Sequence, residues 1–356
     1  MIKVLVVDDS ALARKLLGQV FATEADFEVQ IARDGLEALA RLATFQPDVI
    51  TLDVHMPQMD GLACLDRIMI ERPTPVVMVS SLTAEGAEET LEALRLGAVD
   101  FVAKPEGAVS LRIHEVAPDL VAKVRGAAGA RLRSSLRLKD RLRHRIAAAP
   151  PPRALEPKPD IEVAAATGDG LVLVGTSTGG PPALEALLKP LPASFPWPIL
   201  VAQHMPATFT GPLARRLDSL CELSVVEVVR PMKLEPGCVY IGRGDADLIV
   251  SSRGGALVAM AAPPLDYPWH PSADRLVRSA MGQVAPAQLV GVLMTGMGND
   301  GANAMAELRV AGGQTIAEAE ETAIVWGMPG ELVKAGGASY VEPLTDIAAR
   351  LQQMTP

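Results

Sequence analysis

The sequence predicts an α/β protein with two domains, each built on a doubly wound parallel sheet. The chain has 356 residues, and at roughly 100–200 residues per domain this is enough for two. Short apolar runs alternate with helical patterns in residues 1–122 and again in residues 169–356. Such alternation is typical of a parallel sheet covered by helices. Between the two regions, residues 123–168 are first basic and then rich in proline.

The first region is predicted to contain five strands that alternate with helices. Each strand is a short apolar run, and apolar residues recur at helical spacing between the runs. The predicted strands are residues 2–9, 27–32, 47–54, 75–81 and 99–105, and the predicted helices are residues 11–22, 35–45, 61–70 and 87–97, with a fifth helix from about residue 110.

The α/β alternation resumes with three buried strands, at residues 171–177, 198–205 and 288–297. A polar loop and then a helical pattern follow each of them. Residues 223–260 contain more turn residues and predict hairpins that cover one edge of the sheet. For residues 123–168 we expect a helical extension and a solvated linker; the alternative is a basic segment that docks on a partner.

Composition excludes several classes of function. The formal net charge of −9 is unsuited to binding nucleic acid. The three cysteines are widely spaced and predict neither a disulfide framework nor a zinc site. The N-terminus becomes acidic too early for a signal peptide, and no apolar run approaches the ~20 residues of a membrane span. We therefore expect a cytoplasmic protein that neither binds nucleic acid nor inserts into a membrane.

Charged residues follow the predicted strands of the first region. Asp8 and Asp9 end the first strand, Asp53 ends the third and Lys104 ends the fifth. In a doubly wound sheet these ends converge on one crevice. Three carboxylates there repel each other unless a cation lies among them, and oxygen ligands suit Mg²⁺. Beside Mg²⁺ and a lysine, one carboxylate becomes a good phosphoryl acceptor. Alternatively, each acidic residue merely caps a strand or helix.

Residues 1–122 closely resemble a response-regulator receiver domain, which has a flavodoxin-like five-stranded fold. The resemblance rests on "VLVVDDS", "DVITLDVHMPQMDG", "VVMVSS" and "GAVDFVAKP". It implies that a histidine kinase phosphorylates Asp53. It also implies that Ser80 and Lys104 contact the phosphoryl group and that Phe101 is the aromatic switch residue.

The same resemblance implies a set of Mg²⁺ ligands. Asp9, Asp53 and the backbone carbonyl of His55 would hold the ion, and Asp8 would contribute through the metal's waters. The His55 side chain is expected to be exposed rather than a ligand.

Three residues at predicted strand ends of the second region could form a nucleophilic triad. Ser177 follows the first strand between glycines in "GTSTGG", which leaves its hydroxyl unobstructed. A serine needs a base and a third group that orients the base. His204 ends the next strand, whereas His270 lies in an irregular loop, so His204 is the better candidate for the base. Asp300 follows the third strand and is the candidate orienting acid.

Other interpretations of these residues remain open. "GTSTGG" could bind phosphate, although it lacks the GxGxxG spacing and a following lysine. His204 and Asp300 could each be structural loop residues.

Residues 170–354 resemble the catalytic domain of the chemotaxis protein-glutamate methylesterases. The matching motifs are "VGTSTGG", "VAQHMP", "PGCVYIG", "HPSADRLVRSA", "LVGVLMTGMGNDGA" and "GGQTIAEAEETAIVWGMP". The resemblance implies that Ser177 is the nucleophile, His204 the general base and acid, and Asp300 the residue that orients His204. The Met297 backbone N–H would help to form the oxyanion hole, and Thr178 would line the site.

The two resemblances together imply a methylesterase that is controlled by phosphorylation. Its substrates would be γ-glutamyl methyl esters of methyl-accepting chemotaxis receptors, with methanol released through an acyl-enzyme, and the esterase would need no cofactor. Glutamine deamidation is implied by the same family. Two other classes are kept as alternatives: a phosphorylation-dependent binding module without catalysis, and a receiver joined to a DNA-binding output, for which no helix-turn-helix pattern is present.

Overall fold

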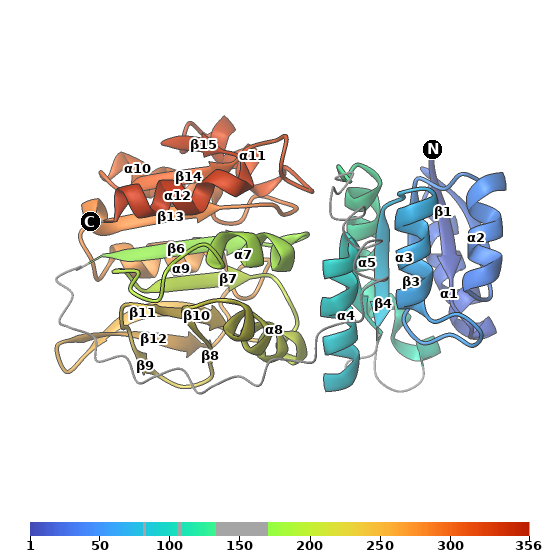
Figure 1. The fold of residues 1–356 in the computed structure, drawn as a ribbon, viewed down its shortest axis with the longest axis horizontal. Helices are drawn as coiled ribbons and strands as arrows, with labels where there is room; N and C mark the ends of the chain where they lie inside the picture. Colours follow the sequence, from blue (N-terminus) through green and yellow to red (C-terminus); the bar gives the residue numbers. More distant parts are fainter. Residues whose placement is uncertain (81–82, 105–108, 133–169, 356) are drawn as a thin grey trace, which may run out of the picture.

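The computed structural model describes residues 1–80, 83–104, 109–132 and 170–355. These residues form two α/β domains that lie side by side, with the N-terminal domain in blue and cyan and the C-terminal domain in green to red (Figure 1). The predicted fold class is therefore confirmed. Residues 133–169, which include most of the predicted linker, lie outside the described residues.

The N-terminal domain is a five-stranded parallel sheet with the order β2-β1-β3-β4-β5. Every residue of β3 and β4 is buried, because helices cover both faces of the sheet. Helix α5 continues past residue 122 to Ala128. The elements are β1 (Ile2–Val7), α1 (Ala11–Ala22), β2 (Phe27–Ala32), α2 (Gly35–Thr44), β3 (Val49–Asp53), α3 (Gly61–Glu71), β4 (Val76–Ser80), α4 (Ala84–Leu96), β5 (Asp100–Ala103) and α5 (Val109–Ala128).

The C-terminal domain is built on a seven-stranded parallel sheet with the order β15-β14-β13-β6-β7-β10-β8. The first three predicted strands of this region, β6, β7 and β13, are its centre. The strands are β6 (Leu171–Thr176), β7 (Ile199–Gln203), β8 (Ser224–Val228), β10 (Cys238–Gly242), β13 (Leu289–Leu293), β14 (Gln314–Glu318) and β15 (Tyr340–Glu342), and the helices are α7 (Gly180–Leu188), α8 (Ala207–Leu220), α9 (Ala273–Met281), a 3-10 turn (Pro286–Gln288), α10 (Ala302–Val310), α11 (Met328–Lys334) and α12 (Leu344–Met354).

The prediction of hairpins in residues 223–260 was right for only part of that stretch. A small antiparallel sheet with the order β11-β12-β9 forms from β9 (Met232–Lys233), β11 (Asp247–Arg253) and β12 (Ala256–Ala262). Strands β8 and β10, in contrast, pair in parallel with each other and extend the main sheet. The turn residues predicted the breaks correctly, but they do not determine which strands pair or in which direction.

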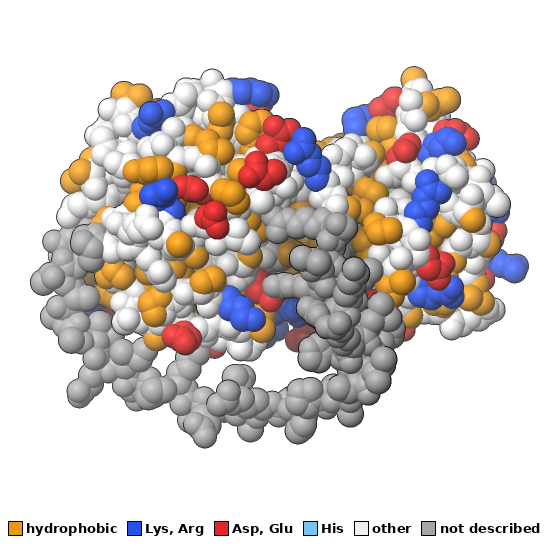
Figure 2. Space-filling view, turned by 45° about the horizontal axis from the view of Figure 1, so that its top comes forward, with side chains coloured by type: hydrophobic (Ala, Val, Ile, Leu, Met, Phe, Trp, Pro, Cys, Tyr) orange, Lys and Arg blue, Asp and Glu red, His pale blue; other side chains and the backbone are white. Residues whose placement is uncertain are grey.

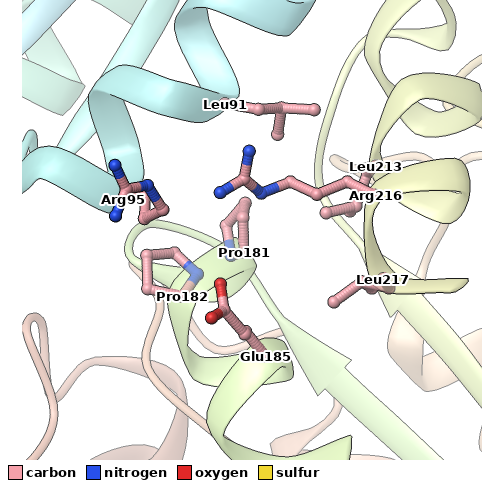
Figure 3. Close-up of a pocket in the computed structure, with 8 residues that line it drawn as sticks. All are labelled: Leu91, Arg95, Pro181, Pro182, Glu185, Leu213, Arg216 and Leu217. Carbon is pink, nitrogen blue, oxygen red and sulfur yellow. The ribbon is translucent and has the colours of Figure 1, made fainter. Parts of the chain in front are cut away.

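The two domains meet where α4 and α5 face the C-terminal domain (Figure 1). One continuous apolar cluster crosses this interface, and it includes Leu91 of α4 and Leu213 of α8. Figure 3 shows a pocket at this interface that is lined by Leu91 of α4 and by Pro181 and Pro182, the first residues after the glycines of "GTSTGG". Acidic and basic side chains line the rim where the two lobes approach each other (Figure 2). The described helices include none that is both long and apolar enough to cross a membrane.

Candidate active site and phosphorylation site

Three adjacent strands bring Ser177, His204 and Asp300 to one edge of the main sheet. Ser177 directly follows β6 and His204 directly follows β7, while Asp300 lies in the loop between β13 and α10. In the sheet order, β13 and β7 flank β6, and the connections run in opposite directions on the two sides of β6. This is a topological switch point, where open α/β sheets place their ligand sites.

Hydrogen bonds join these loops to one another. The Ser177 N–H donates to the Thr295 carbonyl at 3.0 Å, and the His204 N–H donates to the Thr176 carbonyl at 3.1 Å. The Gln203 amide, which sequence reasoning missed, donates to the carbonyls of both Ser177 and His204, at 3.0 Å each. The relative positions of the loops are therefore set by the backbone as well as by side chains.

Glycines leave the space around Ser177 open. Gly179 has a φ of +77°, in the left-handed region that favours glycine. A Cβ at Gly296 would lie 2.7 Å from the Ser177 Cβ, so the β13 loop approaches the serine as closely as a glycine allows. Helix α7 begins three residues after Ser177, and the N-terminus of a helix favours negative charge nearby.

His204 and Asp300 form a buried pair. His204 Nε2 lies 2.8 Å from Asp300 Oδ2, and the two side chains are 8% and 2% exposed. The other ring nitrogen, Nδ1, is buried and has no hydrogen-bond partner among the described residues. One nitrogen is thus bound to a carboxylate, and the other is available to accept a proton.

The carboxylate of Asp300 lies at the N-terminus of α9. Its oxygens accept hydrogen bonds from Ser272 Oγ at 2.9 Å, the Ala273 N–H at 2.6 Å and the Asp274 N–H at 3.0 Å. Burial opposes ionisation, but the hydrogen bond and charge of His204 and these amides outweigh it, so the pKa of Asp300 lies below its usual value. Sequence reasoning missed Ser272, although its place as the N-cap of an amphipathic helix was readable from "HPSADRL".

His270, the alternative base, has a different carboxylate partner. Its Nδ1 lies 2.9 Å from Asp247 Oδ1. Asp247 is fully buried and also receives the Ser272 N–H at 2.9 Å. This arrangement gives His270 a role in holding its loop.

The N-terminal domain touches the other two residues that were predicted for the site. The Thr178 hydroxyl is buried and donates to Asp100 Oδ2 of β5. Gly126 of α5 packs so tightly on the Met297 side chain that a Cβ there would overlap its sulfur. Met297 and Thr178 therefore lie under the interface between the domains.

The acidic cluster of the N-terminal domain has the predicted arrangement. Carboxylate oxygens of Asp8, Asp9 and Asp53 all lie within 4.8 Å of one another. Lys104 Nζ lies 2.8 Å from Asp53 Oδ2 and 3.0 Å from Asp8 Oδ2. Burial raises the pKa of the Asp53 carboxyl, Lys104 opposes this rise, and Asp8 and Asp9 add to it. This donor set fits a hard divalent cation, which would relieve the repulsion.

The remaining predicted residues of this domain lie around the cluster or at the interface. The Ser80 hydroxyl is buried and donates to the Gly86 carbonyl at 3.2 Å. The His55 side chain is exposed, as expected. Phe101 is buried, and its ring centroid lies 4.3 Å from that of Phe209 on α8. The predicted switch residue is thus in direct contact with the C-terminal domain.

Magnesium is expected to stabilise the protein through this cluster. At millimolar concentration it should raise the melting temperature by about 2–4 °C, measured by differential scanning fluorimetry. Asp9→Asn removes an exposed carboxylate oxygen from the cluster and should abolish the shift. Potassium chloride at equal ionic strength controls for screening. An equal shift in the variant would contradict the assignment of these ligands.

Family models match both domains. Residues 172–351 match the CheB methylesterase model, and residues 4–114 match the response regulator receiver domain model. The chain belongs to the CheB methylesterase family. As a member it is an enzyme of the hydrolase class, with a receiver domain in front of the catalytic domain.

Relatives of similar length are named for both activities of the family. A protein-glutamate methylesterase/protein-glutamine glutaminase of Rhodopseudomonas palustris is 58% identical over 98% of this chain and 97% of its own. One from Rhodospirillum rubrum is 53% identical over 99% of this chain and 95% of its own. The crystal structure of the Thermotoga maritima CheB methylesterase catalytic domain, 36% identical, covers 52% of this chain and 98% of its own with a TM-score of 0.51.

Proposed function

We propose that this CheB-family protein is a cytoplasmic protein-glutamate methylesterase and protein-glutamine deamidase whose receiver controls access to the active site. Its substrates are methylated glutamates of methyl-accepting chemotaxis receptors. The observation that carries the proposal is the buried His204–Asp300 pair, at a strand end next to that of Ser177, in which Nδ1 has no hydrogen-bond partner within the described part of the chain.

Acylation begins with Ser177. Its Oγ attacks the ester carbonyl carbon while His204 Nδ1 takes the hydroxyl proton. Asp300 stabilises the imidazolium that forms, and the Met297 N–H stabilises the oxyanion. The support for this role is that the Met297 N–H makes no hydrogen bond within the described residues and directly follows Gly296, which abuts Ser177. The carbon–methoxy bond then breaks, and methanol leaves with the proton from His204.

Deacylation repeats these proton transfers with water. His204 takes a proton from a water molecule as the water oxygen attacks the acyl carbon. The bond to Ser177 Oγ breaks, Ser177 regains a proton from His204, and free glutamate remains on the receptor. With a glutamine side chain the same steps release ammonia. None of these steps calls on a cofactor.

Phosphorylation of Asp53 is the proposed input, with a chemotaxis histidine kinase as the phosphodonor. Mg²⁺ would be held by Asp8, Asp9, Asp53 and the His55 backbone carbonyl, and when bound it neutralises phosphoryl charge. Lys104 Nζ forms an ion pair with Asp53. After phosphorylation the same ammonium group would pair with the phosphoryl oxygens.

Inhibition by the unphosphorylated receiver is supported by where the two domains touch. The hydroxyl of Thr178, the residue after Ser177, donates a hydrogen bond to Asp100, and Gly126 packs on Met297. Phe101, next to Asp100, lies against Phe209. A change in the position of Phe101 on phosphorylation would disturb this interface and expose the site.

The proposal is tested by measuring methanol release from methylated receptor membranes. Release is expected to rise when a small-molecule phosphodonor and Mg²⁺ are added. If the rate of methanol release were the same with and without the donor, control by the receiver would be contradicted but the esterase activity would not. If no methanol were released in either condition, esterase activity on these receptors would be contradicted.

Asp100→Ala should raise the unphosphorylated rate of methanol release by about tenfold, because a hydrogen bond to a charged group is lost from the closed form alone. Asp119→Ala is the matched control. Asp119 pairs with Lys123, as Asp100 does, but is largely exposed on α5, so its loss should leave the rate unchanged. Equal rates in the two variants would argue against the Asp100–Thr178 contact as a restraint.

A further inference from the structure

One aromatic residue lies beside the active site and takes no part in the proposed acyl transfer. Trp269 lies in the loop between β12 and α9. Its ring is parallel to the His204 imidazole, with an interplanar angle of 2° and 5.5 Å between the ring centroids. This separation is within the range of offset-stacked aromatic pairs. The indole is also partly exposed, so it covers His204 instead of filling a core.

The loop that carries Asp300 is shaped to receive this indole. Gly298, two residues before Asp300, has a φ of +80°, and a Cβ there would lie 2.8 Å from the Trp269 ring. Trp269 therefore contacts both the imidazole and the loop of the carboxylate that is paired with it.

The loop around Trp269 is anchored at its C-terminal end. His270 Nδ1 and the Ser272 N–H each lie 2.9 Å from Oδ1 of the buried Asp247, and Arg275 pairs with Oδ2 of the same residue. Ser272 Oγ donates to Asp300 at 2.9 Å. A single anchored segment thus contacts both His204 and Asp300.

His204 needs such a contact because only one of its ring nitrogens is held. Nε2 is bound by Asp300, while Nδ1 has no partner among the described residues. A ring fixed at one nitrogen can still tilt about that hydrogen bond, and in the proposed triad such a tilt would move Nδ1 away from Ser177. A parallel aromatic ring on its face opposes that motion.

We infer that Trp269 is a positioning residue for the general base: stacking on His204, it holds Nδ1 in the direction of Ser177. This inference rests on the proposed triad. It assigns a catalytic purpose to the anchored loop and to the glycine that makes room for the indole.

The test compares Trp269→Phe, which keeps a ring, with Trp269→Leu, which keeps apolar bulk. In the full-length phosphorylated protein, Trp269→Leu should lower kcat for methanol release by about tenfold, with KM unchanged. Trp269→Phe should stay within about twofold of wild type. Trp197→Phe is the matched control, because Trp197 precedes β7 and is at the opposite end of that strand from His204; its kcat should equal that of wild type.

Three results would overturn the inference: an unchanged kcat in Trp269→Leu, an equal loss in the Phe and Leu variants, or a rise in KM alone, which would make Trp269 a substrate contact.

The rate of labelling by a fluorophosphonate provides a second measurement that needs no receptor. Labelling should require Ser177 and should slow in Trp269→Leu to the same extent as kcat. If wild type and Ser177→Ala were labelled at the same rate, the proposed triad itself would be wrong. If labelling required Ser177 but had the same rate in wild type and the Trp269 variants, the triad would stand and this inference would be wrong.

Discussion

Ser177→Ala is expected to lower kcat for methanol release by about 10⁶-fold. The variant removes the only atom to which the acyl group can be attached, while the Ser177 N–H bond to Thr295 and the glycine turn remain. Substrate binding should therefore be intact. The measurement is a single-turnover assay with methylated receptor membranes, together with a melting curve to show that the fold is unchanged.

Thr176→Ser is the matched control for this change. Its hydroxyl is buried one residue away and donates to the Thr295 carbonyl, a bond that serine can also make, so the activity should be close to that of wild type. If Ser177→Ala retained a tenth of the wild-type rate, the acyl-enzyme mechanism would be wrong, and the alternative of a binding module would regain support.

Asp300→Asn is expected to lower kcat by about 10⁴-fold. Burial raises the pKa of Asp300, but His204 and the amides at the start of α9 lower it by more. The net pKa lies below the usual value, so the carboxylate is ionised at neutral pH. An asparagine has no charge to stabilise the imidazolium, and its NH₂ group cannot accept a hydrogen bond from His204 Nε2. The loss should appear in kcat with KM nearly unchanged, measured by steady-state methanol release.

Asp274→Asn tests whether this loss is specific to Asp300. Asparagine keeps an oxygen that can accept the Ala304 N–H, as the Asp274 carboxylate does, and the backbone N–H that donates to Asp300 is unchanged. Its kcat should stay within about threefold of wild type. A similar loss in both variants would indicate that the local negative charge, and not the His204–Asp300 hydrogen bond, is what matters.

Much of the fold was predictable because its signals are local. The five strands of the receiver and the three central strands of the catalytic domain are apolar runs bounded by turn residues, and each was identified correctly. The pairing of β8 and β10 was not predicted, because parallel pairing across residues 223–242 depends on the sheet they join and not on the runs themselves.

The candidate site divides in the same way. Asp53 ends a strand, and Asp8, Ser177 and His204 each directly follow one. A parallel sheet brings the carboxyl ends of its strands to one side, so these residues could be placed from the sequence. Ser272 and Gln203 were missed because their roles are hydrogen bonds to residues on other loops. Asp247, the buried carboxylate that binds His270, Ser272 and Arg275, was also missed. Its sequence context does not distinguish it from an ordinary turn residue.

By itself, the sequence determined which residues can do chemistry and at which strand ends they stand, because apolar periodicity and glycine turns are properties of neighbouring residues. Only the tertiary structure decided which of them meet. Trp269 stacks on His204, and Thr178 donates a hydrogen bond to Asp100, which is 78 residues away in the sequence. These contacts depend on how loops and whole domains pack, and such packing follows from the shape and charge of surfaces that no single stretch of the chain contains.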